Sequence, residues 1–401
     1  MTVRRAALLF LLTAFLLSGT ARAAEKWPAL AKALGKNDAV LVADPQGAVL
    51  FARSRDKKLI PASTLKVLTA LFAIDQLGAD YRFPTEFYVN SDNDLLIKGY
   101  GDPLLVSESV RTIAGRLASK LDEVRDIVLD DSYFDRPIRI PGRANATLQP
   151  YNAPNGALCV NFNTVFFKTE NGRIQSAEPQ TPMLPIARAR IREQKNTAKG
   201  RILLSDRADD SLTYAGQLFS HFLSRAGIEI KGKIRKGRVP DEPGTRLVYR
   251  HAARHDLAAV IESLLEYSNN YMANQLLLAA GAAAYGPPAT LDKGLKALRG
   301  YCRNKLGLKG FTIVEGSGLS RQNRLSARMF AAILSAFKPY YHLMPQNGRV
   351  YAKTGTLDGI RTRAGYIKSE SKGLFPFVVL LNSPGKHADA IVEQIEEMIS
   401  R

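Results

Sequence analysis

Ser63 and Lys66 are the first residues whose types and spacing could do chemistry. They stand three positions apart in the segment 60–66 (IPASTLK). Pro61 favours the first turn of a helix and Gly78 favours its end, so the two side chains are expected to share one helical face. A serine hydroxyl needs a base before it can act as a nucleophile. A lysine buried at a helix N-terminus tends to have a lowered pKa and can be that base. A helix cap followed by a surface lysine is the alternative interpretation.

A second group of polar residues, Ser268, Asn269 and Asn270, interrupts a helical pattern between Ile261 and Leu278. Ser and Asn commonly cap helices, so this S-x-N pattern alone has an ordinary structural explanation. Presented in a cleft, however, the Ser268 hydroxyl could relay a proton. The Asn270 carboxamide could hold a substrate amide.

The third group is Lys353-Thr354-Gly355-Thr356, within a strand-like run. Lys353 supplies positive charge and Thr354 a hydroxyl donor. Gly355 removes a side chain where a substrate backbone must approach. The backbone N–H of Thr356 could help to bind an oxyanion. An ordinary edge strand with a glycine bulge is the alternative.

The elements that must position these residues come from both ends of the chain. Segments 39–42 and 48–52 read as a hairpin around Pro45, and 65–77 as a buried helix. Later segments predict helices at 256–283 and 291–306, strands at 351–357, 362–367 and 377–382, and an amphipathic helix at 388–400. Between 83 and 248 the pattern changes to short β-like runs such as 87–89, 127–129 and 165–167.

We therefore predict an α+β fold in which one domain is interrupted by an insertion. The catalytic domain is expected from residues 24–84 plus 249–401, with an antiparallel sheet flanked by helices. Residues 85–248 are expected to form one or two inserted β-rich domains. Residues 1–23 have the layout of a secretory signal peptide, with Arg4 and Arg5 before an apolar run and small residues around Arg22.

The composition narrows the class of partner. The formal net charge is +19, or +16 without the predicted signal peptide, so the protein should attract polyanions. Export and the lack of nucleic-acid-binding motifs favour anionic wall polymers or carboxylate-bearing peptides over nucleic acid. The two cysteines, Cys159 and Cys302, lie in different predicted domains, and we do not expect them to pair. No metal-binding spacing is present, and neither a metal nor another cofactor is expected.

Together and in order, S-x-x-K, S-x-N and K-T-G are close to the signature of penicillin-binding proteins and β-lactamases. The chain resembles the D-alanyl-D-alanine carboxypeptidases/endopeptidases of the penicillin-binding protein 4 type. The first two motifs are 205 residues apart, as expected if extra domains lie between them, and the last two are 85 apart. Three further segments resemble sequences of the same family: GDPL at 101–104, YNAPNGAL at 151–158 and EGSGLSR at 315–321. Departures are a short insertion, Asn274 where Glu is common, and Glu315 where Asp is common.

The resemblance implies a serine-type carboxypeptidase that acts on peptidoglycan stem peptides through a Ser63 acyl-enzyme and is inhibited by β-lactams. It implies catalytic roles for Ser63, Lys66, Ser268, Asn270 and Lys353, and substrate binding by Thr354, Gly355 and Thr356. The implied location is the periplasm or another cell-wall space. The mature protein is expected to have no transmembrane segment. Whether it contacts the membrane peripherally stays an open question. Whether the enzyme also cuts cross-links as an endopeptidase stays open too.

Three other functions are alternatives to this one. A serine β-lactamase would need a way to activate the deacylating water, and the sequence shows no clear Glu for that. A non-catalytic wall-binding protein of the same fold would not be expected to keep all three motifs. A general esterase would show a Gly-x-Ser-x-Gly elbow with a His partner. The Gly316-Ser317-Gly318 segment lacks that framing and is expected to be a tight backbone turn.

Overall fold

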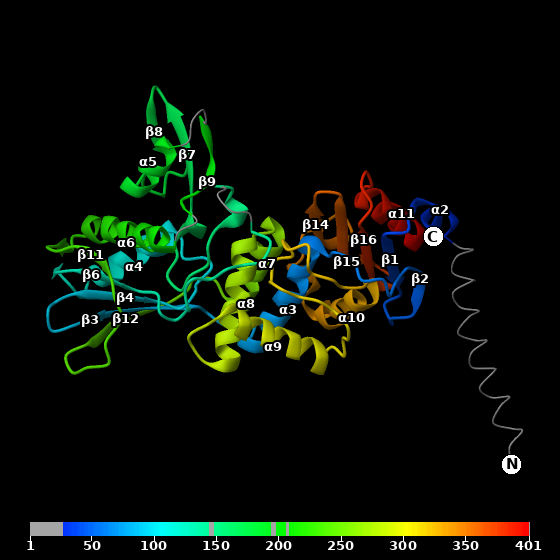
Figure 1. Ribbon diagram of the computed structural model, residues 1–401, viewed down its shortest axis with the longest axis horizontal. Helices are drawn as coiled ribbons and strands as arrows, with labels where there is room; N and C mark the ends of the chain where they lie inside the picture. The colour runs from blue at the N-terminus through cyan, green and yellow to red at the C-terminus, as the bar shows by residue number, and fades with distance from the viewer. Residues whose placement is uncertain (1–26, 144–147, 194–197, 206–207, 401) are drawn as a thin grey trace, which may run out of the picture. The chain divides into compact units, whose positions relative to one another are not determined.

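The computed structural model describes residues 27–143, 148–193, 198–205 and 208–400 (Figure 1). The predicted signal peptide, residues 1–23, lies outside these residues. The chain divides into two compact units. The first comprises the chain up to Leu71 with Tyr301–Val314 and Gly318–Arg401, and the second comprises Phe72–Gly300 with Glu315–Ser317. These limits differ from the predicted domain boundaries at 84/85 and 248/249, which stay a prediction.

The first unit is built on a six-stranded antiparallel sheet of order β13-β14-β15-β16-β1-β2. Its strands combine both ends of the chain: β1 (Asp38–Ala43), β2 (Val49–Arg53), β13 (Gln346–Asn347), β14 (Val350–Leu357), β15 (Ile360–Ser369) and β16 (Gly373–Leu381). The predicted hairpin is β1 and β2. The pairing of β1 with β16 joins the N-terminal and C-terminal parts of the unit, for example Val40 with Val379.

Helices cover both faces of this sheet, which is why β1 is buried along its whole length. On one face, Val40 and Val42 pack with α2 (Pro28–Ala33) and α11 (Ala388–Ser400) in a single apolar cluster. On the other face lies α10 (Ala327–Phe337), where the hydroxyl of Tyr366 donates a hydrogen bond to the Leu334 carbonyl. The short helix η4 (Lys338–Leu343) follows α10 directly.

The segment that carries Ser63 begins with a 3-10 turn, η1 (Ala62–Thr64), and continues as α3 (Leu65–Leu77). Leu65, Val67 and Leu68 are fully buried, and so are the polar side chains of Lys66 and Thr69. A helix buried on all sides fixes its first turn by packing from several directions, so the residues there have little freedom to move.

The second unit contains a mixed five-stranded sheet of order β11-β6-β4-β3-β12, a two-stranded pair β10-β5 and a three-stranded sheet β8-β7-β9. The bounds of its strands are β3 Pro84–Val89, β4 Leu95–Gly99, β5 Glu123–Val124, β6 Ile127–Asp130, β7 Thr164–Glu170, β8 Arg173–Ser176, β9 Lys199–Leu203, β10 Glu229–Ile230, β11 Ile234–Lys236 and β12 Arg246–Ala252. The three β-like runs named from the sequence fall in β3, β6 and β7.

Helices are also prominent in the inserted region, although the sequence pattern emphasised its strands. Helices α4 (Ser107–Ala118), α5 (Pro185–Arg192) and α6 (Ala208–Arg225) supply apolar residues to the same core as β4 and β6. Short 3-10 turns lie at η2 (Pro150–Asn152) and η3 (Asn161–Asn163). The insertion is therefore a mixed α/β region.

The helical stretch expected at 256–283 is two helices, α7 (Leu257–Tyr267) and α8 (Asn270–Tyr285). They are followed by α9 (Leu291–Asn304). Helices α8 and α9 cross closely, since a Cβ placed on Gly281 would lie 2.5 Å from the backbone nitrogen of Gly294. In the part of the chain that the structure describes, no helix has the length and apolar character needed to cross a membrane. Cys159 and Cys302 are both buried and free.

Candidate active site

The backbone that presents Ser63 is unusual. Ala62, just before it, has φ +48, in the left-handed region that alanine rarely adopts. Two hydroxyls hold the preceding carbonyl in place: both Thr64 Oγ1 (2.6 Å) and Thr362 Oγ1 (2.8 Å) donate to the oxygen of Pro61. Strain of this kind persists only where the surroundings fix the conformation. Here β15, through Thr362, helps to fix it.

Lys66 lies beside Ser63 as the sequence predicts. Its Nζ is 3.0 Å from Ser63 Oγ, which is hydrogen-bonding distance. The lysine side chain is 0 % exposed, and Ser63 is half-buried. An amine and a hydroxyl at this distance can exchange a proton. The arrangement can therefore take a proton from the serine and return it later.

Strand β14 packs directly against the backbone of Ser63. A Cβ placed on Gly355 would lie 2.1 Å from Thr362 Oγ1 and 3.0 Å from the backbone nitrogen of Ser63. Only glycine fits at this point, because the Thr362 hydroxyl and the Ser63 backbone approach it closely; the close approach of a substrate backbone stays a prediction. Lys353 is 1 % exposed, and its Nζ is 3.4 Å from Thr354 Oγ1. Within the first unit, the structure thus brings together Ser63, Lys66 and the K-T-G strand.

The outer edge of β14 is open beyond its first residues. The neighbouring strand β13 pairs only with Val350 and Tyr351, and Ala352 donates to the Pro345 carbonyl. From Lys353 to Leu357, no further strand pairs with this edge among the residues that the structure describes. An unpaired edge can accept another extended chain by backbone hydrogen bonds.

Gly318 makes a third close backbone contact at Ser63. It has φ +82, and a Cβ placed on it would lie 1.8 Å from the carbonyl oxygen of Ala62. This agrees with the expected tight turn at 316–318. Gly318 therefore allows its segment to reach the turn that carries the serine.

The S-x-N residues belong to the second unit. Ser268 caps the end of α7 with φ +53 in the left-handed region, and Asn269 caps the start of α8 by accepting from Met272 N at 3.1 Å. Asn270 is the first residue of α8, and its Nδ2 donates to the Tyr151 carbonyl at 3.4 Å. The interruption expected from the sequence is a sharp turn between two capped helices.

Buried amide side chains hold α8 to the segments that the family resemblance singled out. Gln275, fully buried, donates to the carbonyls of Gly101 (3.1 Å) and Gly156 (3.0 Å) and accepts from Asn155 Nδ2 (3.0 Å). Asn155 also donates to the Tyr271 carbonyl at 2.9 Å. The motifs at 101–104 and 151–158 thus support the helix that begins with Asn270.

Two of the three departures from the family pattern, Asn274 and Glu315, lie in this unit. Asn274 Oδ1 accepts from the backbone N–H of Gly316 at 2.8 Å, and its Nδ2 donates to the Asn270 carbonyl at 3.2 Å. Glu315 is buried and accepts from both the backbone N–H and the hydroxyl of Ser317, each at 2.6 Å. Asn274 therefore links the S-x-N turn to the EGSG segment.

A buried carboxyl lies in the same supporting region. Asp102 is 5 % exposed, and burial raises its pKa to about 7, although a hydrogen bond from the Leu104 N–H opposes the rise. Burial likewise raises the pKa of the Cys159 thiol and of Tyr271. None of these groups was assigned a role from the sequence, and their burial is consistent with structural positions.

Sequence reasoning did not single out Ala62, Thr362 or Tyr267, and it named Tyr151 only as the first residue of the segment YNAPNGAL. The two tyrosines are 49 % and 78 % exposed, which is uncommon for large aromatic side chains, and each adjoins the S-x-N residues. Tyr267 could have been noticed as the aromatic residue directly before the motif. The backbone role of Ala62 leaves no such signal. Among the described residues, no group of three or more His, Cys, Asp or Glu could hold a metal ion.

An antiparallel sheet flanked by helices, with S-x-x-K at a buried helix start beside a K-T-G strand, is the architecture of the serine penicillin-recognising enzymes. Comparison with known proteins agrees. The model of the D-Ala-D-Ala carboxypeptidase 3 (S13) family matches residues 21–205 and 196–342. The chain therefore belongs to this family, and it is a serine-type peptidase.

Named relatives are distant in sequence but cover most of the chain. A D-alanyl-D-alanine carboxypeptidase from an Actinomadura species is 25% identical over 441 residues, which span 89% of this chain and 80% of the relative. The D-alanyl-D-alanine carboxypeptidase DacB of Haemophilus influenzae is 22% identical over 418 residues, spanning 88% of this chain and 84% of the relative.

Solved structures share the fold. Penicillin-binding protein 4 of Haemophilus influenzae has a TM-score of 0.73 at 21% identity and covers 93% of this chain and 98% of its own. A predatory peptidoglycan endopeptidase from Bdellovibrio bacteriovorus has a TM-score of 0.53 at 17% identity and covers 90% of this chain and 91% of its own. At this level of identity, the likeness concerns the fold alone.

Proposed function

We propose that the protein removes the terminal residue of D-alanyl-D-alanine peptides in peptidoglycan through an acyl-enzyme on Ser63. Lys66 takes the hydroxyl proton as Ser63 Oγ attacks the carbonyl carbon between the two D-alanines. The C–N bond then breaks, D-alanine leaves with a proton on its amine, and water later hydrolyses the ester. The observation that carries the proposal is the 3.0 Å distance between the buried Lys66 Nζ and Ser63 Oγ.

The backbone geometry supports a place for the developing oxyanion. The Ser63 nitrogen lies against β14, and the Thr356 N–H follows Gly355 on that strand. We assign these two N–H groups to the oxyanion, a contribution of roughly 3 kcal/mol per donor in comparable enzymes. The unpaired edge beyond Lys353 would let the substrate peptide add as a further strand, which aligns its carbonyl with the serine.

The other motif residues have roles that follow from their chemistry and from the family. Lys353, Thr354 and Thr356 would bind the terminal carboxylate of the substrate, and Gly355 would leave room for its backbone. Ser268 would pass a proton to the leaving amine, and Asn270 would hold an amide of the acyl chain. These assignments use no metal or organic cofactor.

The same chemistry extends to inhibitors and to branched substrates. A β-lactam presents a strained amide in place of the D-alanyl-D-alanine bond, so it would acylate Ser63 and leave slowly. Cutting of cross-links would use the same residues on a branched peptide. We also propose that the chain is exported to the periplasm or an equivalent wall space, where its substrate lies.

The decisive test replaces Ser63 by Ala. Fluorescent penicillin should label the wild-type protein one to one and should not label Ser63→Ala, while the control Ser119→Ala, at an exposed helix end, should label normally. Mass spectrometry of the labelled protein should place the adduct on the peptide that contains Ser63. Stoichiometric labelling of Ser63→Ala would rule out Ser63 as the nucleophile.

A second measurement separates the activities that the family contains. Purified cross-linked and uncross-linked muropeptides are incubated with the protein, and the masses of the products are measured by mass spectrometry. Loss of one alanine mass identifies a carboxypeptidase, and conversion of dimers to monomers identifies an endopeptidase. Rapid turnover of a chromogenic cephalosporin with no muropeptide product would instead identify a β-lactamase.

A further inference from the structure

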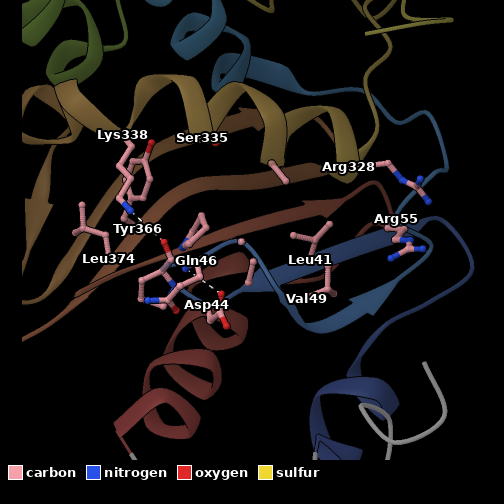
Figure 2. Close-up of a pocket in the computed structure, with 15 residues that line it drawn as sticks. Leu41, Asp44, Gln46, Val49, Arg55, Arg328, Ser335, Lys338, Tyr366 and Leu374 are labelled. Atoms are coloured by element: carbon pink, nitrogen blue, oxygen red, sulfur yellow. Dashed lines mark hydrogen bonds between the residues drawn. The ribbon is translucent and has the colours of Figure 1, made fainter. Parts of the chain in front are cut away.

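A groove in the first unit lies between α10 and the β1–β2 hairpin, and it includes none of the motif residues (Figure 2). Its volume is about 420 Å³, within the range of sites that bind small molecules. Its floor comes from β1, β2 and β16, and Tyr366 of β15 also lines it, but no residue of β14 does. The groove is therefore separate from the residues assigned to catalysis.

One wall of the groove is a stripe along α10. The residues Arg328, Ala331 and Ser335 of α10 and Lys338, the first residue of η4, follow one another at spacings of three, four and three residues, so they lie along one side. The opposite side, which includes Phe330 and Ile333, is buried in the core. In Figure 2, Lys338 and Arg328 stand at opposite ends of this stripe, with Ser335 between them.

The groove is apolar in the middle and has cationic side chains at both ends. Leu41, Val49 and Leu374 contribute apolar surface, and Val49 is 44 % exposed. At one end, Arg55 and Arg328 approach the single carboxylate of Asp56, at 3.8 Å and 2.6 Å. The two arginines together therefore keep an excess of positive charge.

At the other end, Lys338 donates one hydrogen bond to the Pro45 carbonyl at 3.1 Å. An ammonium has three donors, so two more are available for a ligand. The only carboxylate in the lining is Asp44, which accepts from the backbone N–H groups of Gln46 and Ala48 within its own turn. Asp44 keeps its negative charge and directly precedes Pro45, so this end binds an anion through the N–H donors of Lys338, while the two-arginine end also has an excess of positive charge.

We propose that this groove binds a short anionic peptide in an extended conformation. Arg328 and Lys338 are ten residues apart, about 15 Å along a helix, which matches four to five residues of extended chain. A peptide with carboxylates near both ends would pair with both cationic ends, and small side chains would fit over Ala331. A lipid would offer one charged headgroup instead of two separated charges.

The identity of the natural ligand rests on the proposed function. Stem peptides of peptidoglycan are short and carry carboxylates, so the groove would hold a second stem while another is cut. In this way it would tether the enzyme to its polymeric substrate. Binding in the groove itself does not depend on catalysis.

The test uses the full-length protein with Ser63 already acylated by penicillin, and the probe is N-acetyl-Glu-Ala-Ala-Ala. Calorimetric titration should show one peptide bound per acylated protein. Lys338→Glu should weaken binding at least tenfold, and Ser335→Trp, which fills an exposed part of the groove, should abolish it. Lys309→Glu, an exposed charge reversal outside the groove, should bind as the wild type does.

Three outcomes would overturn the proposal. These are no uptake by the acylated protein at millimolar peptide, unchanged affinity in Ser335→Trp, or binding of anionic phospholipid vesicles in place of the peptide. Penicillin labelling of the same samples reports separately on Ser63. A protein that labels normally and takes up no peptide contradicts the groove alone, whereas failure to label contradicts the proposed function.

Discussion

Backbone contacts support Ser63 in the first unit, whereas amide side chains support Asn270 in the second. Around Ser63, Gly318 and Gly355 approach so closely that a Cβ on either would overlap its neighbours. Around α8, hydrogen bonds of Gln275 and Asn155 connect the helix to the neighbouring segments. Steric support of the first kind tolerates almost no change, but hydrogen bonds can lengthen or be replaced by water. The first unit should therefore be more sensitive to small substitutions.

The largest effect is expected from Lys66→Ala. If Lys66 is the base, its removal should slow acylation by penicillin by about 10³- to 10⁴-fold, near the upper limit for general-base catalysis. The second-order rate of labelling measures this. Ser268→Ala, in the second unit, should lower the labelling rate about 100-fold, and Lys309→Ala should leave that rate nearly unchanged. Acylation of Lys66→Ala within tenfold of the wild type would contradict the assignment.

Gly318→Ala should destabilise the protein by about 4 kcal/mol and abolish labelling. The new methyl group would meet the Ala62 carbonyl, and the positive φ adds strain. Urea unfolding and penicillin labelling measure the two effects. As a control, Gly115→Ala in α4 has open space and should raise the free energy of unfolding by about 0.5–1 kcal/mol. Similar stability of the two variants would show that the contact at Ser63 is not tight.

Gln275→Leu should cost about 3 kcal/mol in unfolding free energy. The carbonyls of Gly101 and Gly156 and the amide of Asn155 would lose a buried partner, while the volume changes little. Denaturant unfolding measures the loss, and hydrogen exchange should show faster opening of α8. Gln322→Leu, at an exposed position, should stay within about 0.5 kcal/mol. A loss as small as in that control would mean that water replaces the amide.

The smallest expected effect of a substitution is at Asp102, and it depends on pH. Its pKa in the folded protein is about 7, above the ordinary value of 3.8. Between pH 4 and 7 the unfolded chain ionises while the folded carboxyl keeps its proton, so the free energy of unfolding falls over this window and is constant above it. The full shift corresponds to roughly 4 kcal/mol.

Asp102→Asn should remove this fall and stabilise the protein at pH 8 by about 2 kcal/mol, because burying the amide donors offsets part of the gain. Unfolding at pH 3.5 and pH 8 measures it, with the exposed Asp241→Asn as the control. An equal fall in the Asp102→Asn variant and the wild type would show that another group titrates.

Much of the first unit could be predicted because its elements are regular. The hairpin of β1 and β2, the strands β14 and β15 and the helix α11 follow alternation or helical spacing in short stretches of sequence. The three helices of the insertion were harder to predict. Their apolar residues pack into a core that they share with strands distant in sequence. The turns between these elements dominated the sequence pattern of the region. The groove beside α10 left no sequence signal, since hairpin and helix are nearly 300 residues apart.

The sequence by itself determined which residues could react. It placed Ser63 three residues before Lys66, supplied the K-T-G strand and marked the S-x-N turn, because reactive side chains and their helical or strand spacing are local properties. Only the tertiary structure decided that Gly355 and Gly318 lie against the backbone around Ser63, that Ala62 is left-handed and that Thr362 holds the Pro61 carbonyl. Such contacts join residues that are far apart in the chain, and close packing of the whole unit is what selects them.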